Sequence, residues 1–455
     1  MSEALALSPQ GGRLRALVLA GIAIAAAAAA FGWFGLGLLS MPGLLLLLAT
    51  LAGGGLAIAA LGPELLVVAA PALMPLPLLW IVFPYELAFV PLAFFFLLHA
   101  LRTRPAWLTR LEDFEVWNLL LLAWAFYTGF WCDELAVYGL GVRKLAMGAL
   151  ALWVSYRLAH RVPRIVFEIG LVANATLLCV AALARRNALG TTIKGLDRAS
   201  ATDLGWGTAN AIATLLLLLG PILLWIATNH RDRWLRIGTW PALVLSGFMQ
   251  LVIASRAAAV LFAGGLLAQV STGWHRRSWI AFGVTLAAIV GFAASPLGAP
   301  LLARFTSPRE LGSVVVRLLY FREAWHRTVD NLPWGIGLNQ GFFYPDHLQA
   351  VDPHNYWLML SSELGLPGVA LWAVVLVMLW RRVRRVGRTP GWEGLGRALQ
   401  ISFWLSQLHT LVEPTFQGPQ YQFLYFWTIG GFLGYHAVAV ANHSRTTSEL
   451  RSGDQ

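Results

Sequence analysis

Apolar stretches of roughly membrane-spanning length recur along this chain and restrict its fold more than any other feature. A helix needs about 20 apolar residues to cross the hydrocarbon core of a bilayer. Of the 455 residues, 58% are apolar and 12% are charged, with a mean hydropathy of +0.65. A typical soluble domain carries about 25% charged residues, so a soluble globule and a disordered chain are both excluded. We therefore predict an all-α polytopic membrane protein that forms a single integral membrane domain over residues 1–455.

Fourteen segments are candidate spans, and several prolines interrupt the region 65–101, so we expect about 12–14 transmembrane helices. The first segment is too long for the 7–15-residue apolar region of a signal peptide, which favours an uncleaved span. The candidates are 16–39, 43–62, 65–82, 86–101, 114–132, 145–159, 165–184, 209–227, 237–254, 257–272, 278–294, 356–380, 397–412 and 423–441.

The arginine-rich loops predict the orientation. The densest basic cluster lies in 381–396, and cytoplasmic loops of membrane proteins are enriched in Lys and Arg. Counting spans outward from this loop places both termini in the cytoplasm. It also leaves 295–352 as one loop bearing short helices on the outer face. We expect the protein to be surrounded by membrane lipids.

Ten basic residues fall on the side that should be poor in them. The chain has a net charge of +11, and all but two of its 33 basic residues are arginines. A high background of arginine explains some of the ten, and topology explains most of the charge, so we predict no nucleic-acid partner. The alternative is an outward-facing site for a polyanion such as a diphosphate, which arginine binds with bidentate geometry. The ten are Arg185, Arg186, Lys194, Arg198, Arg256, Arg304, Arg309, Arg317, Arg322 and Arg327.

The segment 352–356, with sequence Asp-Pro-His-Asn-Tyr, opens the candidate span 356–380. Asp is a favoured N-cap and Pro a favoured first helical residue, which predicts His354 in the first turn. The positive end of the helix dipole would keep its imidazole neutral, as a general base requires. The alternative is an interfacial His that caps or packs. Deeper in the same span, Glu363 either serves the site or forms a structural ion pair.

Two arginines occupy positions that suggest binding of a phosphate. Arg256 lies in a tight hairpin between two apolar runs, where the alternative is a side chain that reaches to lipid headgroups. Arg317 lies in 313–325, whose pattern predicts an amphipathic helix on the outer surface. Asn210, at the outer end of the span 209–227, would cap that helix or contact a sugar. The adjacent acids Asp133 and Glu134 are weak evidence for a metal, so we expect no metal or cofactor.

Taken together, these segments resemble the O-antigen ligase and O-antigen polymerase superfamily. Ser255-Arg256 is similar to that family's Ser-Arg hairpin. Arg317 with Phe321 and Trp325 is similar to its Arg-then-aromatic helix. Residues 333–339 resemble its Pro-x-Gly-x-Gly segment, and 353–356 with 363–368 resemble its most specific signature. The resemblance covers roughly residues 200–380.

This resemblance implies a glycosyltransferase-C-like fold and a metal-independent, inverting glycosyltransferase. The donor would be a glycan on undecaprenyl diphosphate, and the acceptor a sugar hydroxyl of lipid A-core, as in lipopolysaccharide biosynthesis. The location would be a bacterial inner membrane, with 295–352 as a periplasmic loop and the active site facing the periplasm. His354 would deprotonate the acceptor, while Arg256 and Arg317 would hold the diphosphate. The candidates for further substrate contact are Asn355, Tyr356, Asn210, Arg198 and Glu363.

Three alternatives remain open. An O-antigen or exopolysaccharide polymerase would use the same chemistry with another lipid-linked repeat as the acceptor. A transferase of glycans to protein tends to have a longer C-terminal part than this chain. A solute transporter belongs to a different class, and it would place its polar residues near the midplane of the membrane. Glu168, Glu363 and His409 are too scattered in the sequence to indicate such a path.

Overall fold

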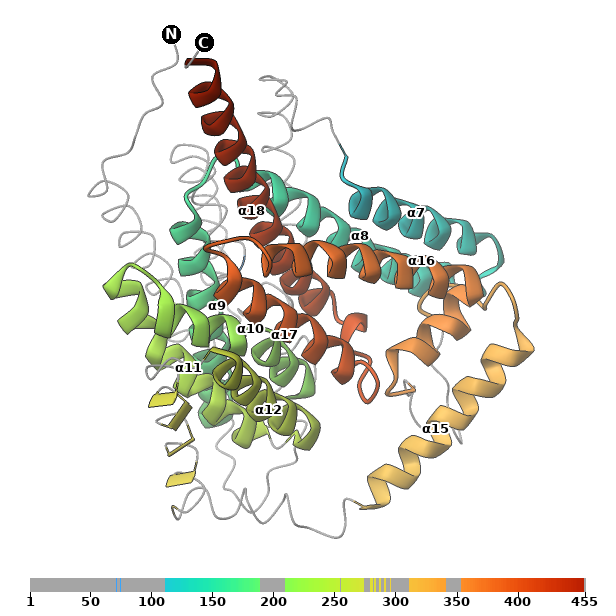
Figure 1. Ribbon diagram of the computed structural model, residues 1–455. Coiled ribbons are helices and arrows are strands. Elements are labelled where there is room, and N and C mark those ends of the chain that lie inside the picture. Colours follow the sequence, from blue (N-terminus) through green and yellow to red (C-terminus); the bar gives the residue numbers. More distant parts are fainter. Residues whose placement is uncertain are drawn as a thin grey trace, which may run out of the picture.

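A computed structural model describes residues 111–188, 209–253, 255–273, 311–340 and 353–453, with isolated positions between 71 and 295. The described residues form helices and contain no strand, which confirms the all-α class (Figure 1). Nearly all of the region before residue 111 and most of the candidate span 278–294 lie outside the described residues. The helices are α7 (Asp113–Tyr127), η1 (Thr128–Trp131), α8 (Leu135–Leu158), α9 (Arg164–Ala188), α10 (Ala209–Asn229), α11 (Arg233–Ile253), α12 (Arg256–Gly273), α15 (Leu311–Asp330), α16 (Tyr356–Val386), α17 (Glu393–His409), η5 (Thr415–Gln417) and α18 (Pro419–Gly453).

Six of the described helices are long and apolar enough to cross a membrane, and they support the prediction of a multi-pass membrane protein. α12 is apolar but shorter. The total of 12–14 spans and the glycosyltransferase-C-like fold stay predictions. The six segments are Leu135–Leu158, Arg164–Leu183, Asn210–Asn229, Arg233–Ile253, Tyr356–Val386 and Pro419–Ser444.

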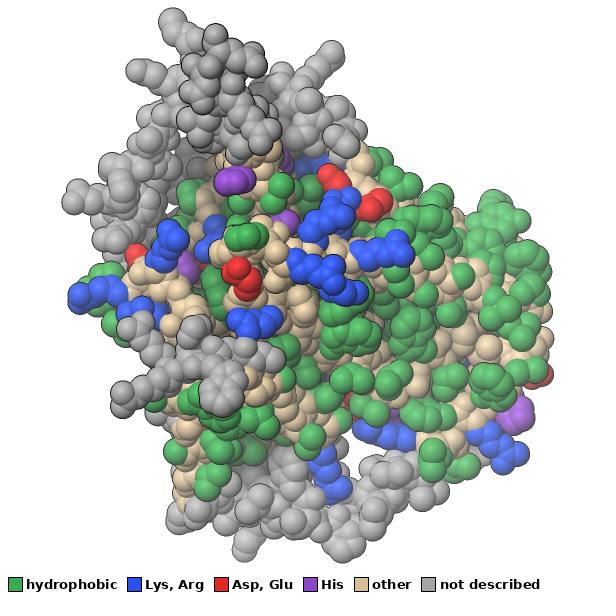
Figure 2. Space-filling model, viewed as in Figure 1, with side chains coloured by type: hydrophobic (Ala, Val, Ile, Leu, Met, Phe, Trp, Pro, Cys, Tyr) green, Lys and Arg blue, Asp and Glu red, His purple; other side chains and the backbone are tan. Residues whose placement is uncertain are grey.

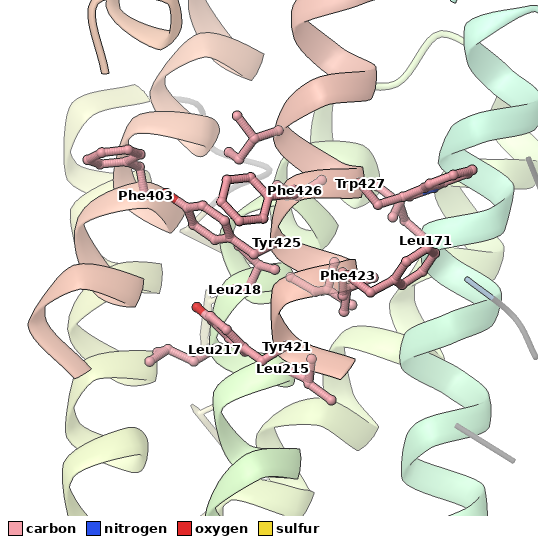
Figure 3. Close-up of a cluster of buried hydrophobic side chains, with 14 of the residues drawn as sticks. Leu171, Leu215, Leu217, Leu218, Phe403, Tyr421, Phe423, Tyr425, Phe426 and Trp427 are labelled. Atoms are coloured by element: carbon pink, nitrogen blue, oxygen red, sulfur yellow. The ribbon is translucent and has the colours of Figure 1, made fainter. Parts of the chain in front are cut away.

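Helix α10 lies at the centre of the bundle, and its surface is apolar on every side. A helix of this kind is stable in a protein interior or in lipid, and here it lies in the interior. Residues 215–219 of α10 are five consecutive leucines, and none of them is exposed. α10 packs against α9, α11, α12, α17 and α18. Figure 3 shows its leucines beside the aromatic side chains of α17 and α18.

Helices α8 and α18 approach each other closely through small residues. Gly430 and Gly434 lie one turn apart on α18. A Cβ added at Gly434 would lie 2.2 Å from the carbonyl oxygen of Tyr156, and one at Gly430 would lie 2.8 Å from that of Leu152. Glycines four residues apart allow this backbone contact between membrane helices. The contact sets α18, and therefore the loop that precedes it, firmly against α8.

Helix α16 breaks at Gly365, and the loop after α15 fills the break. Gly365 has φ 65° and ψ −169°, a conformation that a side chain would strain. The backbone N–H of Ile336 donates to Ser362, and that of Gly337 donates to Glu363, both at 2.9 Å. The N–H of Leu366 donates to the carbonyl of Pro333, also at 2.9 Å. The segment 333–337 thus supplies the hydrogen bonds that the helix loses at its break.

Helices α8 and α16 extend beyond their predicted spans. α8 begins at Leu135, ten residues before the predicted span 145–159. Its Lys144 does not end the helix because its ammonium donates to the Asn339 side chain at 3.0 Å inside the protein. α16 continues past residue 380 to Val386, and carries Arg384 and Arg385 in its last turn. Figure 2 shows basic side chains in several groups, many of them in the upper half of the view, beside a broad apolar area.

Candidate functional site

Three polar side chains from distant parts of the chain converge on the carboxylate of Glu413. The Asn210 amide donates to Oε1 of Glu413 at 2.7 Å, and the Arg317 guanidinium donates to the same oxygen at 2.8 Å. The other oxygen, Oε2, lies 3.4 Å from Nδ1 of His354. Glu413 follows α17, Asn210 begins the apolar part of α10, Arg317 lies on α15, and His354 precedes α16. We call these four residues the Glu413 cluster.

The exposure of the cluster is uneven. The side chain of Glu413 is 8% exposed, whereas those of Arg317 and His354 are each 28% exposed. The carboxylate is therefore buried beneath an arginine and an imidazole that both still reach solvent. Arg317 also lies 3.4 Å from the carbonyl oxygen of Val412, which helps hold its guanidinium over the carboxylate.

Glu413 stays ionised although it is buried. Burial alone would raise the pKa of its carboxyl, but the hydrogen bond with His354 and the charge of Arg317 outweigh burial. The net result is a pKa below its ordinary value of 4.5. A carboxylate facing Nδ1 favours the imidazole tautomer with its proton on that nitrogen. Nε2 of His354 is then the nitrogen that can accept a proton.

His354 itself is placed differently from the sequence prediction. Helix α16 begins at Tyr356, and its N-cap is Asn355, whose side chain accepts from the N–H of Leu358 at 3.0 Å. The prediction that His354 lies in the first helical turn is wrong, and Asp352 lies outside the described residues. His354 instead precedes the helix with φ 48°. The group that faces its Nδ1 is therefore the carboxylate of Glu413 and not the N-terminus of the helix.

The helix predicted around Arg317 is present as α15, which spans Leu311–Asp330, and its position on the outer surface of the membrane stays a prediction. It leaves Leu318, Leu319 and Trp325 more than half exposed, while Ala324 is buried. Tyr320 stacks on the ring of His354, with ring centres 6.2 Å apart and planes at 22°. α15 therefore contributes both a guanidinium and an aromatic surface to the Glu413 cluster.

A buried group of hydroxyls and one imidazole supports the cluster from beneath. Nδ1 of His409 lies 3.2 Å from the hydroxyl of Thr214 and 2.9 Å from that of Thr415. His409 is fully buried, and the N–H of Glu413 donates to its carbonyl at 3.0 Å. These contacts attach the loop that carries Glu413 to α10 at Thr214, which lies four residues after Asn210.

Arg256 is the first residue of α12, at the same end of the bundle as Asn210. The Gln250 side chain, near the end of α11, donates to the carbonyl of Ala213 near the start of α10 at 2.9 Å. The hairpin that follows α11 therefore lies beside the start of α10. Ser255 in this hairpin is buried, and Arg256 is partly exposed. That Arg256 and Arg317 share one cavity stays a prediction.

Glu363 belongs to a second cluster, apart from the direct contacts around Glu413. It is 1% exposed, and its Oε2 accepts from the N–H of Asn339 at 2.8 Å. The Asn339 side chain in turn accepts from Lys144. This arrangement joins α8, the loop after α15 and the break in α16. It favours a structural role for Glu363. From the sequence alone, a structural role and a contact with substrate were both open.

Two of the other residues predicted to contact substrate also have structural contacts in the protein. Asn355 caps α16 and donates from its amide to the carbonyl of Leu411 at 3.1 Å. Tyr356 is buried, and its N–H donates to Thr410 at 2.9 Å, so both residues attach the start of α16 to the Glu413 loop. Arg198 lies outside the described residues. On the exposed side of α15, Arg327 forms an ordinary i, i+4 ion pair with Glu323 at 3.3 Å.

Sequence analysis did not single out Glu413. A usable signal was present, because Glu413 and Pro414 directly follow the candidate span 397–412. A carboxylate at the end of a span, on the same side as the ten basic residues, is a natural partner for one of them. What the sequence could not provide is the pairing of this acid with residues 59, 96 and 203 positions away.

Within the described residues, the chain is a helical membrane protein with a buried carboxylate beneath an arginine and a histidine at one end of the bundle. No family model matches this sequence, and no curated protein matches it.

Proposed function

We propose that the protein is an inverting glycosyltransferase that moves a glycan from undecaprenyl diphosphate to a sugar hydroxyl. The observation that carries the proposal is the convergence of Asn210, Arg317 and His354 on Glu413. These three residues were selected from the sequence for roles in one reaction. Their contacts with a single carboxylate support a common site.

In the proposed reaction, Nε2 of His354 accepts the proton of the acceptor hydroxyl. The acceptor oxygen forms a bond with the anomeric carbon of the donor, on the face opposite the phosphate. The bond from that carbon to the phosphate oxygen breaks, and its electron pair remains on the diphosphate. Arg317 and Arg256 stabilise this growing negative charge, as oriented cations do when they are in place before the reaction.

Glu413 has two functions in this scheme. Its carboxylate holds His354 in the tautomer that can accept a proton and stabilises the imidazolium that then forms, as the acid of a catalytic triad does. It also anchors Arg317, leaving part of the guanidinium exposed toward a ligand. Because the carboxylate lies beneath both groups, it does not compete directly for the surface where an anion would bind.

The proposed acceptor is a sugar of lipid A-core, which makes the protein a ligase of the O-antigen type. The second candidate uses another lipid-linked repeat as the acceptor, which makes it a polymerase. Both readings place the site on the periplasmic face of a bacterial inner membrane, with the arginine-rich end of α16 in the cytoplasm. The positive-inside rule supports this orientation.

The glycolipids of a deletion strain test the proposal. A ligase predicts full-length polymer stranded on undecaprenyl diphosphate, whereas a polymerase predicts single repeats stranded there. Complementation with the wild-type chain should restore the profile, and complementation with His354→Ala should not. A deletion strain with unchanged glycolipids would refute both readings and favour a different class, such as a transporter.

A further inference from the structure

An apolar groove opens between α12, α16 and α17, away from the Glu413 cluster. Its volume is about 400 Å³. α12 contributes Gly264 and Gly265, α16 contributes Trp380, and α17 contributes Gln400, Trp404 and Leu405. Figure 1 shows α12 beside α17, and the two helices are in direct contact.

The two glycines create the groove. A Cβ at Gly264 would meet nothing within 4 Å, so the space above this residue is open. A Cβ at Gly265 would lie 2.3 Å from a methyl group of Leu405, so this glycine lets α17 approach α12 closely. The opposite wall is aromatic, because Trp380 and Trp404 meet edge to face with ring centres 5.2 Å apart.

A strip of exposed apolar side chains connects the groove with the Glu413 end of the bundle. Trp404, Leu408 and Leu411 are each about half exposed, at 49%, 46% and 47%, and they follow one another at intervals of four and three residues. Residues at this spacing lie on one face of a helix. The strip therefore runs along α17 from the groove to the loop that carries Glu413.

The depth of the groove follows from helix geometry. At about 1.5 Å of rise per residue, Trp404 lies about 7.5 Å from His409 along α17, and Gln400 lies about 13.5 Å from it. On α12, Gly264 lies about 12 Å from Arg256 by the same measure. The two helices that frame the groove thus bear, at one end of the bundle, the arginine and the loop assigned to the diphosphate.

We infer that this groove receives the polyprenyl tail of the lipid-linked donor while the diphosphate is held at the Glu413 end. The inference rests on the proposed function and adds a binding site for the lipid part of the substrate. A donor held at its diphosphate must leave its tail in the surrounding hydrocarbon. The strip on α17 is a continuous apolar path from that end, and the groove provides a fixed place for the branched chain.

The test compares two glycine variants of the full chain reconstituted in lipid. Gly264→Phe places a ring in the groove without a clash at Cβ. Gly238→Phe is the matched control, because Gly238 is also an exposed helical glycine with nothing within 4 Å of its Cβ, but it lies on α11. The donors are the glycan on undecaprenyl diphosphate and an analogue shortened to a single prenyl unit, which is too short to enter the groove.

We expect Gly264→Phe to raise the KM for the long donor at least tenfold while kcat is retained. The kinetics with the short analogue should match those of the wild-type chain, and Gly238→Phe should match the wild type with both donors. If Gly264→Phe handles the long donor as the wild type does, the groove is not the tail site. Equal damage with both donors would also overturn the inference, because it would indicate a general defect.

A binding measurement separates this inference from the proposed function. A photoreactive polyprenyl diphosphate without a glycan should label the peptide that contains Trp404 in the wild type, and label it less in Gly264→Phe. This result would support the groove even if the wild-type chain transferred no glycan. Labelling of the same peptide by a photoreactive phospholipid, without displacement by polyprenyl diphosphate, would assign the groove to bulk lipid and overturn the inference.

Discussion

Replacement of Glu413 by Gln tests the central geometry of the candidate site because it changes charge and proton placement while keeping shape. Asn210 and Arg317 both donate to Oε1, and the amide oxygen of Gln can retain both contacts. The amide NH₂ then occupies the position of Oε2, 3.4 Å from Nδ1 of His354. It can only donate there, so it favours the tautomer with the proton on Nε2, which cannot act as a base.

The expected cost to catalysis is large and the cost to stability is small. Loss of a positioned general base lowers rates about 10²–10⁴-fold, and because the contact is long we expect about 10² for Glu413→Gln. A 10²-fold loss corresponds to about 2.7 kcal/mol of transition-state stabilisation. Because the amide oxygen keeps both Oε1 contacts and Arg317 still reaches solvent, the lost charge should destabilise the fold by about 1–2 kcal/mol.

The assay is transfer of a labelled glycan from the lipid-linked donor by the purified, reconstituted chain, with thermal stability measured in parallel. Glu323→Gln is the matched control, because that carboxylate pairs with Arg327 on the exposed side of α15 and should not affect transfer. A Glu413→Gln variant as active as the wild type would refute the assigned role of the carboxylate. A variant that fails to fold would refute the claim that the amide retains both Oε1 contacts.

The pH dependence provides a second readout of the same residue. The pKa of Glu413 is lowered in the folded protein, so its ion pairs add stability above the ordinary carboxyl value of about 4.5. That contribution is lost as the pH falls through the lowered pKa. Gln does not titrate, so the difference in melting temperature between wild type and Glu413→Gln should shrink as the pH is lowered toward and below 4.5. A constant difference over that range would contradict the assignment.

Three further predictions concern the same reaction. His354→Ala should lower transfer by about 10²–10⁴-fold in the reconstituted assay, while His326→Ala, on the exposed face of α15, should remain active; equal rates for both would remove His354 from the mechanism. Arg256→Lys and Arg317→Lys should each impair transfer substantially, because lysine keeps the charge but loses the planar fork; normal rates in both would contradict bidentate binding of the diphosphate. Transfer should survive treatment with EDTA, and a dead enzyme that revives with magnesium or manganese would show that a metal is needed.

The sequence predicted the helices well where hydrophobicity alone decides them. α9, α10, α11 and α12 begin and end within about four residues of the predicted spans, because long apolar runs with polar ends leave few alternatives. α8 was predicted too short, since Lys144 looks like the end of a span until its buried partner Asn339 is known. Periodicity carries no information about a partner that lies 195 residues away.

The candidate site was predicted in part for a similar reason. His354 and Arg317 stand out because charged or polar groups beside apolar runs require an explanation. Glu413 did not stand out, since its burial and its three contacts arise only when α10, α15 and α17 are packed together. The N-cap of α16 was assigned to the wrong residue because Asp352 and Asn355 are both good caps, and tertiary contacts with the Leu411 carbonyl favour the second.

The hydrogen bonds at the break in α16 also determine which substitutions that region tolerates. Ile336, Gly337 and Leu366 are bound through their backbone N–H groups, so these bonds place no direct demand on side-chain chemistry. A Cβ at Gly365 would lie 2.1 Å from the carbonyl oxygen of Pro333, so no other residue fits there without displacement of the backbone. Gly335 and Gly337 are constrained in the same way, because both have positive φ and a Cβ at either would lie within 2.7 Å of a neighbouring atom. Among related sequences, the three glycines, Glu363 and the lengths of both stretches should therefore be kept, because an inserted residue would shift every bond of the pairing. The other positions of the pairing should vary more in side chain.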